Sequence, residues 1–596
     1  MAETRRVDYA NEKQEVSYAE NAHEPADSSL DLQKEMTLQG VDMKNTHAVK
    51  GDDSDGKIIW SVRSIFAAIF LAALYTGSQI ILYFTGGSLA FIAADNNITT
   101  GIAWLPTANI LAIAAACPYA GYLQDLFGKR YIALFGSFCI CVGCALVGSG
   151  RSYAQLVAGT SLSSLEATYS DSDRHGHFRY RCCHWRIDWS RWYRGYSLAL
   201  VTAFVIPFCP YLIYVEMWSH HDTTVGWRWG PWVSLMFNGI VGIGLAFTYF
   251  PHNQTRAEGF SRMAILKRID YIGGLLSITG LTLFLVSLQA GGYSHPWKSS
   301  YVLGTLLSGL ALIAGWIVWE ARFARHPMIP RELFKGQRIV GLAYVVAFTA
   351  GMNFFSILNF FPITFTSVYD PVPIRIGLRG LGPGLCTAVG AIVFNAALSK
   401  FPYHTREVLL LAVVLMTTFA GALGASTPEN ESMTLAFGSI AGFGVGGVLV
   451  PAATIAMLVC PDAIITTAAA LSLSIRTVGG TIGYSIYYNI FITRLTKKLP
   501  LYTAEYAVKA GLPLSSEESF VGLFLIEPAK LATTPIPGVT PAIVAAATRG
   551  TQWAYSESLK YVWLTSIAFG SVAVICTILL PSTAKYQTNR VAVQIS

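Results

Sequence analysis

Long apolar segments recur along almost the whole of this 596-residue chain. An α-helix needs about 20 consecutive apolar residues to cross the hydrocarbon core of a bilayer. Thirteen segments approach or exceed that length, and only 13% of the residues are charged, about half the share found in a soluble domain. The sequence therefore predicts an all-helical, multi-pass integral membrane protein. The predicted spans are 64–93, 103–123, 131–150, 196–216, 230–250, 271–291, 301–319, 338–366, 374–398, 407–425, 433–459, 464–493 and 559–581.

A fourteenth slot, near 153–175, breaks this pattern. Residues 163–193 hold acids, histidines and five arginines where a fourth helix should lie, namely Arg174, Arg179, Arg181, Arg186 and Arg191. Because a charge at the centre of a span costs about 2.5–3.5 kcal/mol, residues 171–191 should not cross a bilayer. We interpret the stretch as out of frame, through a gene-model error or a real lesion. A genuine amphipathic cytoplasmic loop is the alternative.

Basic residues in the connections predict the orientation of the chain. With the polar tail 1–57 inside, thirteen Lys and Arg residues fall in cytoplasmic loops and five in outer loops, and cytoplasmic loops are the ones enriched in these residues. Both termini are then inside, the connection 494–558 is outside, and the sequons at Asn97 and Asn430 are glycosylation candidates. The expected units are a disordered tail 1–57, an N-terminal bundle 58–255, two extra central helices with their loops in 256–337, a C-terminal bundle 338–582, and a tail 583–596.

Several other classes of function are disfavoured by the same sequence. The net charge of +7 is explained by the cytoplasmic loops, so we expect no nucleic-acid partner. The glycine-rich run that ends in Gly446 and Gly447 has neither the preceding strand nor the following lysine of a phosphate-binding loop. We expect it to be a closely packed, bendable segment with Pro451. The spacing around Cys182 fits no usual zinc pattern. We therefore expect no metal, no cofactor and no enzymatic activity.

The strongest local signal is the segment from Gly121 to Arg130, between the second and third predicted spans. Gly121 would let two helices approach closely, and Gly128 would relieve backbone strain in a tight turn. Asp125 can face a helix N-terminus or a basic side chain. Lys129 and Arg130 would lie at anionic headgroups.

This segment resembles the loop motif of the major facilitator superfamily, in which it acts as a conformational latch between two halves. The resemblance extends to the fourteen-helix drug:proton antiporters through Trp227-Arg228-Trp229, Asn238, Asp270–Gly273, Trp319-Glu320 and Pro327–Pro330. The segments Tyr75–Gln79, Leu82–Ser88, Ile206–Pro210 and Ser474–Gly480 look like those of the fungal trichothecene efflux pump family. Together these matches cover about residues 60–495 and 559–581.

The resemblance implies two pseudo-symmetric six-helix bundles plus two central helices, fourteen spans in all. It also implies proton-coupled export of a hydrophobic small molecule, such as a trichothecene-like toxin or another secondary metabolite. Two departures leave the proton-coupling residue unassigned. The first span has no acid between Tyr75 and Ser88, and Pro207 and Pro210 replace the glycine-rich motif of the fifth span. Prolines free backbone carbonyls in a spanning helix, so we expect a hinge there.

Ionisable groups inside spans are costly and usually functional. For Arg476, in the thirteenth span, two interpretations have equal weight. It lines the substrate or proton path, or it forms a structural hydrogen bond to carbonyls of neighbouring helices. Glu216 and Asp95 lie near span ends, where an interfacial role is favoured although Glu216 is kept as a path candidate. The remaining candidates for a substrate or proton path, each of which could instead serve interhelical packing, are Gln79, Trp104, Asn109, Asn353 and Asn359.

Two rival functions stay open. The same fold could take up an iron–siderophore, or the chain could be a non-transporting sensor or inactive paralogue with a broken fourth helix. The expected partners are a small-molecule substrate, protons and the lipid bilayer, and we expect a monomer. The expected location is the plasma membrane, with a vacuolar or vesicle membrane as the alternative.

Overall fold

The computed structural model describes residues 62–163, 226–250, 262–329, 338–369, 373–460, 464–526 and 536–583, with short gaps within 88–103 and at 293–294, and also residue 333. In these ranges every regular element is a helix, and ten helices are long and apolar enough to cross a membrane. Twelve of the thirteen predicted spans coincide with described helices. The other, 196–216, lies outside the described residues, as do Asn97, Pro207, Pro210 and Glu216.

The N-terminal half consists of tightly packed helices. They are α3 (Val62–Gly87), α5 (Trp104–Phe127), α6 (Lys129–Gly148), α7 (Tyr153–Ser163) and α11 (Trp229–Thr248). α6 and α7 touch at glycines, because a Cβ added to Gly143 would lie 2.6 Å from the Ser163 nitrogen. α7 fills the first part of the weak fourth slot. Nearly all of the anomalous stretch 163–193 lies beyond Ser163, outside the described residues.

A helical hairpin follows the N-terminal half. The short helix α12 (Arg262–Arg268) leads into α13 (Tyr271–Ala290), which pairs with α14 (Ser300–Val318), and a π-helical turn continues to Phe323. Asp270 caps α13 by accepting a hydrogen bond from the Gly273 N–H, and Ser299 caps α14 through Val302. These caps fix where each helix begins, because they satisfy N–H groups that have no partner within the helix.

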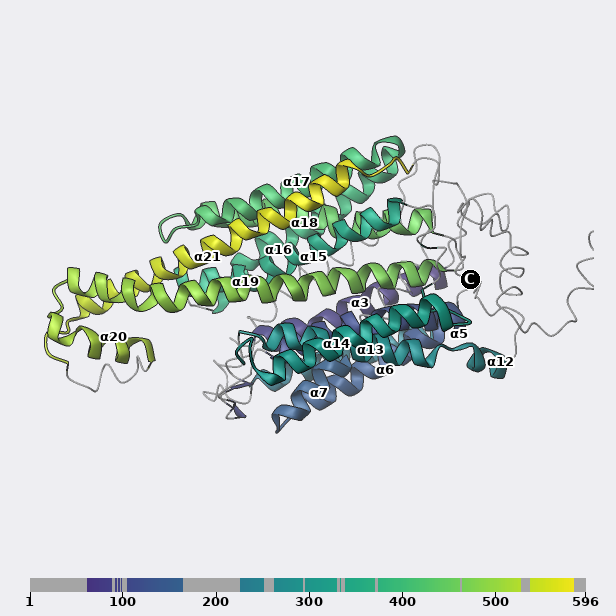
Figure 1. The fold of residues 1–596 in the computed structure, drawn as a ribbon, viewed down its shortest axis with the longest axis horizontal. Coiled ribbons are helices and arrows are strands. Elements are labelled where there is room, and N and C mark those ends of the chain that lie inside the picture. The colour runs from purple at the N-terminus through teal and green to yellow at the C-terminus, as the bar shows by residue number, and fades with distance from the viewer. Residues whose placement is uncertain are drawn as a thin grey trace, which may run out of the picture.

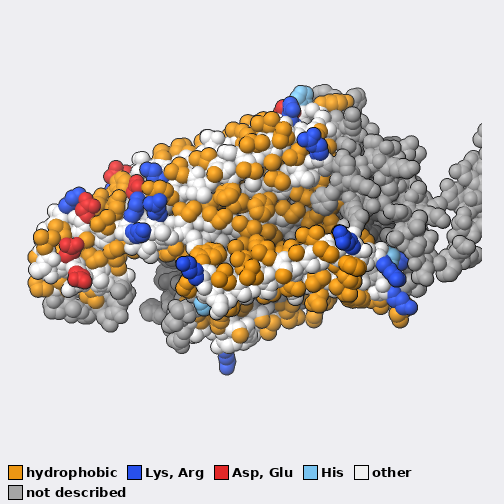
Figure 2. Space-filling model, viewed as in Figure 1, with side chains coloured by type: hydrophobic (Ala, Val, Ile, Leu, Met, Phe, Trp, Pro, Cys, Tyr) orange, Lys and Arg blue, Asp and Glu red, His pale blue; other side chains and the backbone are white. Residues whose placement is uncertain are grey.

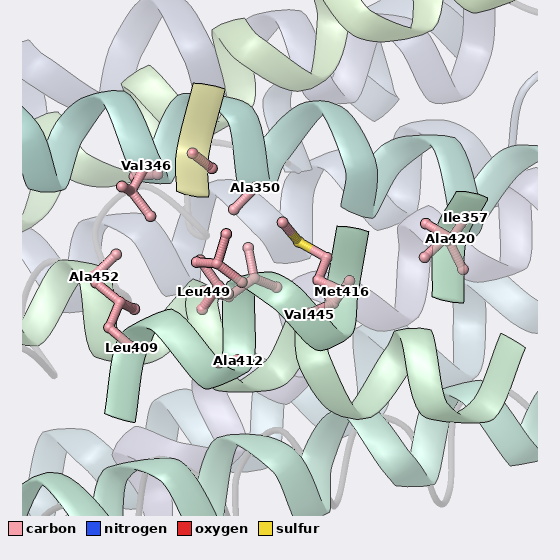
Figure 3. Close-up of a cluster of buried hydrophobic side chains, with 14 of the residues drawn as sticks. Val346, Ala350, Ile357, Leu409, Ala412, Met416, Ala420, Val445, Leu449 and Ala452 are labelled. Atoms are coloured by element: carbon pink, nitrogen blue, oxygen red, sulfur yellow. The ribbon is translucent and has the colours of Figure 1, made fainter. Parts of the chain in front are cut away.

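The C-terminal half has the largest apolar core. Its helices are α15 (Arg338–Thr364), α16 (Pro373–Lys400), α17 (Thr405–Ala422), α18 (Glu431–Val459), α19 (Ile465–Lys509) and α21 (Pro541–Ile578). Figure 3 shows Val346 and Ala350 of α15 close to Leu449 of α18, with Met416 of α17 beside them. Helices with so many small and branched buried side chains approach closely without polar contacts.

The connection 494–558 is largely helical. α19 continues to Lys509, α20 covers Glu517–Ile526, and α21 already begins at Pro541. At the left of Figure 1 these three helices form a lobe at the end of the bundle, with Phe520 buried inside it. Figure 2 shows charged side chains gathered on this lobe and at the opposite end, with a broad apolar surface between them. That distribution matches a protein whose middle faces lipid.

Candidate functional site between the two halves

Asp125, near the end of α5, lies against the first turn of α19. Its carboxylate is 5% exposed and accepts hydrogen bonds from the Thr467 N–H at 2.9 Å and the Thr467 Oγ1–H at 2.5 Å. The positive end of a helix dipole favours a negative charge at this position. The acid of the predicted motif therefore bonds an N-terminal helix to a C-terminal one. Thr467 carried no sequence signal of its own.

The same two helices stay in close contact farther along. A Cβ on Gly121 would lie 2.4 Å from the Ala470 Cβ, so only glycine fits between α5 and α19. Farther along both helices, Ser474 donates a hydrogen bond of 2.6 Å to the carbonyl of Ala114. The predicted close approach at Gly121 is thus present, and its partner is a helix from the other half.

The turn after Asp125 is a single residue long. Gly128 has φ +86°, a region that L residues rarely adopt, and it directly precedes α6. Arg130 donates to the Ala246 carbonyl at 3.0 Å, and its guanidinium lies 3.6 Å from the centre of the Phe250 ring. Lys129 is buried. These contacts bind Arg130 to α11, and the position of both basic residues at the headgroups stays a prediction.

Beyond Ser474, α19 contacts α13 as well as α5. Ser485 donates to the Gln289 side chain at 3.1 Å, and Asn489 donates to the Gly291 carbonyl at 3.4 Å. Gln289 also reaches Thr107 of α5, at 3.5 Å. Interhelical hydrogen bonds of this kind contribute on average about 0.6 kcal/mol each in a membrane. This polar contact can therefore break at low cost.

The other end of α13 is joined to α5 through a more apolar contact. Tyr122 donates to the Arg268 carbonyl at 2.9 Å and accepts from the Asp270 N–H at 3.3 Å. Around it Tyr122, Leu126 and Met328 form a buried cluster. Trp319, from the turn after α14, donates to the Asp270 carboxylate at 3.0 Å. The Asp270 and Trp319 segments named in the sequence thus meet here.

The candidate path residues in the C-terminal half lie along α15 and α19. Arg476 is partly buried in α19 and makes no hydrogen bond or ion pair with the described residues. Asn353 is buried and accepts from Tyr487 at 3.3 Å, while its Nδ2 has no partner among the described residues. Asn359 donates to the Phe355 carbonyl of its own helix at 2.7 Å. Tyr487 was not predicted.

Candidates in the N-terminal half are more dispersed. Asn109 is buried and donates to the Thr160 carbonyl of α7 at 3.4 Å, which is an interhelical contact. Trp104 begins α5 and is half-buried. Gln79 belongs to α3, but its side chain lies outside the described part of the structure. The structure does not bring these residues together with Arg476 into one described cluster.

The residues Trp227, Arg228 and Asn238, which carry part of the family resemblance, form hydrogen bonds within the N-terminal half. Arg228 forms an ion pair with Asp95 at 2.8 Å and donates to the Gly150 carbonyl at 2.8 Å. Trp227 also donates to Asp95, at 3.1 Å. This cluster joins the chain beyond α3 to the ends of α6 and α11, and the interfacial role of Asp95 stays a prediction. Asn238, buried in α11, donates to the Ser234 carbonyl at 2.8 Å and to Gly77 of α3 at 3.4 Å.

The glycine-rich segment lies inside α18. A Cβ on Gly446 would lie 1.8 Å from the Thr387 carbonyl oxygen, and one on Gly447 would lie 2.4 Å from the Phe394 ring. Pro451 is buried within the same continuous helix. Close packing is therefore visible, and bending remains a prediction. Asn430 is exposed just before α18.

Comparison with known proteins gives the family. The family model described as "Fungal trichothecene efflux pump" matches residues 111–596. This chain belongs to that family. The relatives include the efflux pump dotC of Dothistroma septosporum, which is 27% identical over 62% of this chain and 63% of its own length. The trichothecene efflux pump of Fusarium sporotrichioides is 22% identical over 62% of each chain.

Among solved structures, the chain is similar to the proton:xylose symporter XylE, with 12% identity, a TM-score of 0.48, and coverage of 89% of this chain and 98% of the other. Membership of the trichothecene efflux pump family confirms the predicted family and the all-helical major facilitator fold. The protein is a multi-pass membrane protein of a transporter family. The chain matches less than two thirds of the length of dotC, and the count of fourteen spans stays a prediction.

Proposed function

We propose that this protein exports a hydrophobic small molecule by proton-coupled secondary transport. The cargo class is a trichothecene-like sesquiterpenoid or another secondary metabolite, in line with the printed names of its relatives. The observation that carries the proposal is the bond between Asp125 and Thr467, which joins the two halves at one end of the bundle. Alternating access requires that such a contact form in one state and break in the other.

The strength of this contact suits a latch. Hydrogen bonds to a charged group contribute about 1.5–3 kcal/mol each, so two of them bias the halves without locking them. Converting a population from 1:99 to 99:1 takes about 5.5 kcal/mol, which is within reach of this contact together with substrate binding. Asp125, Gly121 and Gly128 are proposed to act as the latch and its turn, and Arg130 to hold that turn on α11.

The roles of the other candidates remain part of the proposal. Arg476, Asn353 and Asn359 are proposed to line the path on the C-terminal side, because Arg476 and the Asn353 Nδ2 lack partners among the described residues. Gly446, Gly447 and Pro451 are proposed as a bendable part of α18. We propose a monomer that works in the plasma membrane, driven by the proton gradient.

A transport assay in a fungal strain that lacks the gene tests the proposal. The strain is complemented with this reading frame, with Asp125→Asn, or with Glu505→Gln, which alters an exposed pair on α19. We expect the native chain and Glu505→Gln to lower the cell content of a labelled trichothecene, and Asp125→Asn to lose most of that export. A protonophore should abolish export by the native chain.

Three outcomes contradict the proposal. Export that survives the protonophore excludes proton coupling. Accumulation of an iron–siderophore, without toxin export, favours uptake by the same fold. Equal inactivity of the native and Asp125→Asn chains, with both present in the membrane fraction, favours a non-transporting protein.

A further inference from the structure

The contact of α19 with the N-terminal side has two consecutive segments. From Thr467 to Ser474 it packs on α5, where Asp125 and Ala114 accept its hydrogen bonds. From Val478 onward it also meets α13, in an apolar cluster that Leu285 shares with Leu111 and Ala114 of α5. In Figure 1, α13 and α14 are drawn next to α19, and the contacts between them come from α13. The hairpin therefore adds a second, smaller contact with α19 beside that of α5.

The two ends of α13 are attached in different ways. Near Asp270, α13 and the turn after α14 are joined to α5 by buried aromatic and apolar side chains, including Tyr122 and Met328. A Cβ on Gly274 would lie 2.5 Å from the Tyr119 ring, so α13 and α5 also pack closely there. This end has the character of a core contact.

The opposite end of α13 meets α19 through small and polar groups. Ser485 and Asn489 bond to Gln289 and to the Gly291 carbonyl. Gly292 has φ +78°, and a Cβ there would lie 1.9 Å from the Asn489 side-chain oxygen, so the chain turns tightly against α19. A few side-chain hydrogen bonds, each of modest strength in a membrane, are suited to repeated opening.

We infer that the α13–α14 hairpin moves as part of the N-terminal half and supplies a second gate, formed by Gln289 and Gly291 against Ser485 and Asn489. This gate lies at the opposite end of the bundle from the latch at Asp125. Both contacts are formed in this structure, as in an occluded state. In the cycle each opens in turn while the other stays closed, with α19 pivoting near Ser474. The two extra helices are thus a moving part of transport, and this inference rests on the transport cycle proposed above.

Reversible cross-linking in membrane vesicles tests the inference. Gln289→Cys with Ser485→Cys places one thiol on each side of the gate. Tyr119→Cys with Gly274→Cys places them across the contact between α13 and α5. With a short bifunctional methanethiosulfonate reagent, we expect the gate pair to lose transport at least tenfold and to regain it after reduction. We expect the α13–α5 pair to stay within twofold of the untreated variant, and the reagent-treated native chain serves as the control.

A distance measurement keeps the inference separate from transport itself. Spin labels at the exposed positions Lys298 and Thr496 report across the gate, and labels at Tyr131 and Tyr271 report within the N-terminal half. In double electron–electron resonance we expect two distance populations for the pair Lys298 and Thr496. We expect one for the pair Tyr131 and Tyr271. One population for both pairs, two populations for the second pair, or full transport with the gate cross-linked would overturn the inference. If the native chain does not transport, the distances still decide it.

Discussion

The carboxylate of Asp125 and the hydroxyl of Thr467 are 342 residues apart in the chain and 2.5 Å apart in the structure. Asp125 belongs to the loop motif that the sequence analysis identified, whereas Thr467 belongs to no predicted motif. Because α19 continues from Thr467 to the gate at Asn489, the latch and the gate share one rigid element. Changes at either end should therefore affect the same transport cycle.

Thr467→Val should weaken the latch without removing it. The variant loses the hydroxyl bond but keeps the backbone N–H bond, so we expect a severalfold fall in transport rate. Thr467→Ser should stay near the native rate because it keeps the hydroxyl, and Thr496→Val is an exposed control on the same helix. The effects of Thr467→Val and Asp125→Asn should be clearly non-additive in the double variant, since the two residues share one contact. Additive losses would mean that the two residues act separately.

Gly121→Ala should separate α5 from α19. The new methyl group would lie 2.4 Å from the Ala470 Cβ, and overpacking of this kind typically costs 1–3 kcal/mol. We expect transport to fall at least tenfold. Gly304→Ala is the matched control, because nothing lies within 4 Å of a Cβ at that position, and it should stay within twofold of the native rate. Equal effects at both positions would argue against a tight α5–α19 contact.

Arg228→Ala should destabilise the N-terminal half. It removes the ion pair to Asp95 and the bonds to the Gly148 and Gly150 carbonyls, leaving Asp95 partly buried without its cation. We expect a loss of about 2 kcal/mol, within the range for hydrogen bonds to charged groups, seen as a lower unfolding temperature in detergent. Arg406→Ala breaks an exposed pair with Glu407 and should shift that temperature little. A larger fall in unfolding temperature for Arg406→Ala than for Arg228→Ala would contradict this prediction.

Arg476→Met should separate a transport role from a structural one. An uncompensated charge within a span is costly, so removing it should leave the unfolding temperature unchanged or raise it. If Arg476 lines the transport path as proposed, export should nevertheless fall, and Arg476→Lys should retain part of it because the charge remains. A lower unfolding temperature with intact residual transport per folded molecule would assign Arg476 to structure alone.

His326, in the turn after α14, should make stability depend on pH. Burial, together with Arg268 and Arg325 nearby, lowers the pKa of its imidazole below the ordinary 6.5. The unfolded chain therefore binds a proton more readily than the folded one, and stability falls as the pH drops through that region. Between pH 7.5 and 5.5, the unfolding temperature should fall more for the native protein than for His326→Gln. An equal fall would show that this group does not contribute.

Local sequence patterns were sufficient to predict the spanning helices. They also predicted the segment that contributes Asp125 to the latch. Apolar length predicted α15 and α18 because a bilayer-crossing helix must satisfy its backbone hydrogen bonds internally, whatever it packs against. The spacing from Gly121 to Arg130 predicted the tight turn, and Gly128 has the positive φ that such a turn needs. The helical nature of 494–558 was missed because its polar, proline-containing sequence lacks the length of apolar residues on which the prediction relied.

The sequence by itself determined that this protein is a helical membrane protein of the trichothecene efflux pump family, and it marked Asp125 as a key residue. Only the tertiary structure decided that Thr467 is the partner of Asp125 and that α13 also bonds to α19. The physical reason is that spanning helices are apolar on the sides that face lipid and also on the sides that face each other. Composition therefore predicts that a helix spans, and interhelical packing alone selects its neighbours.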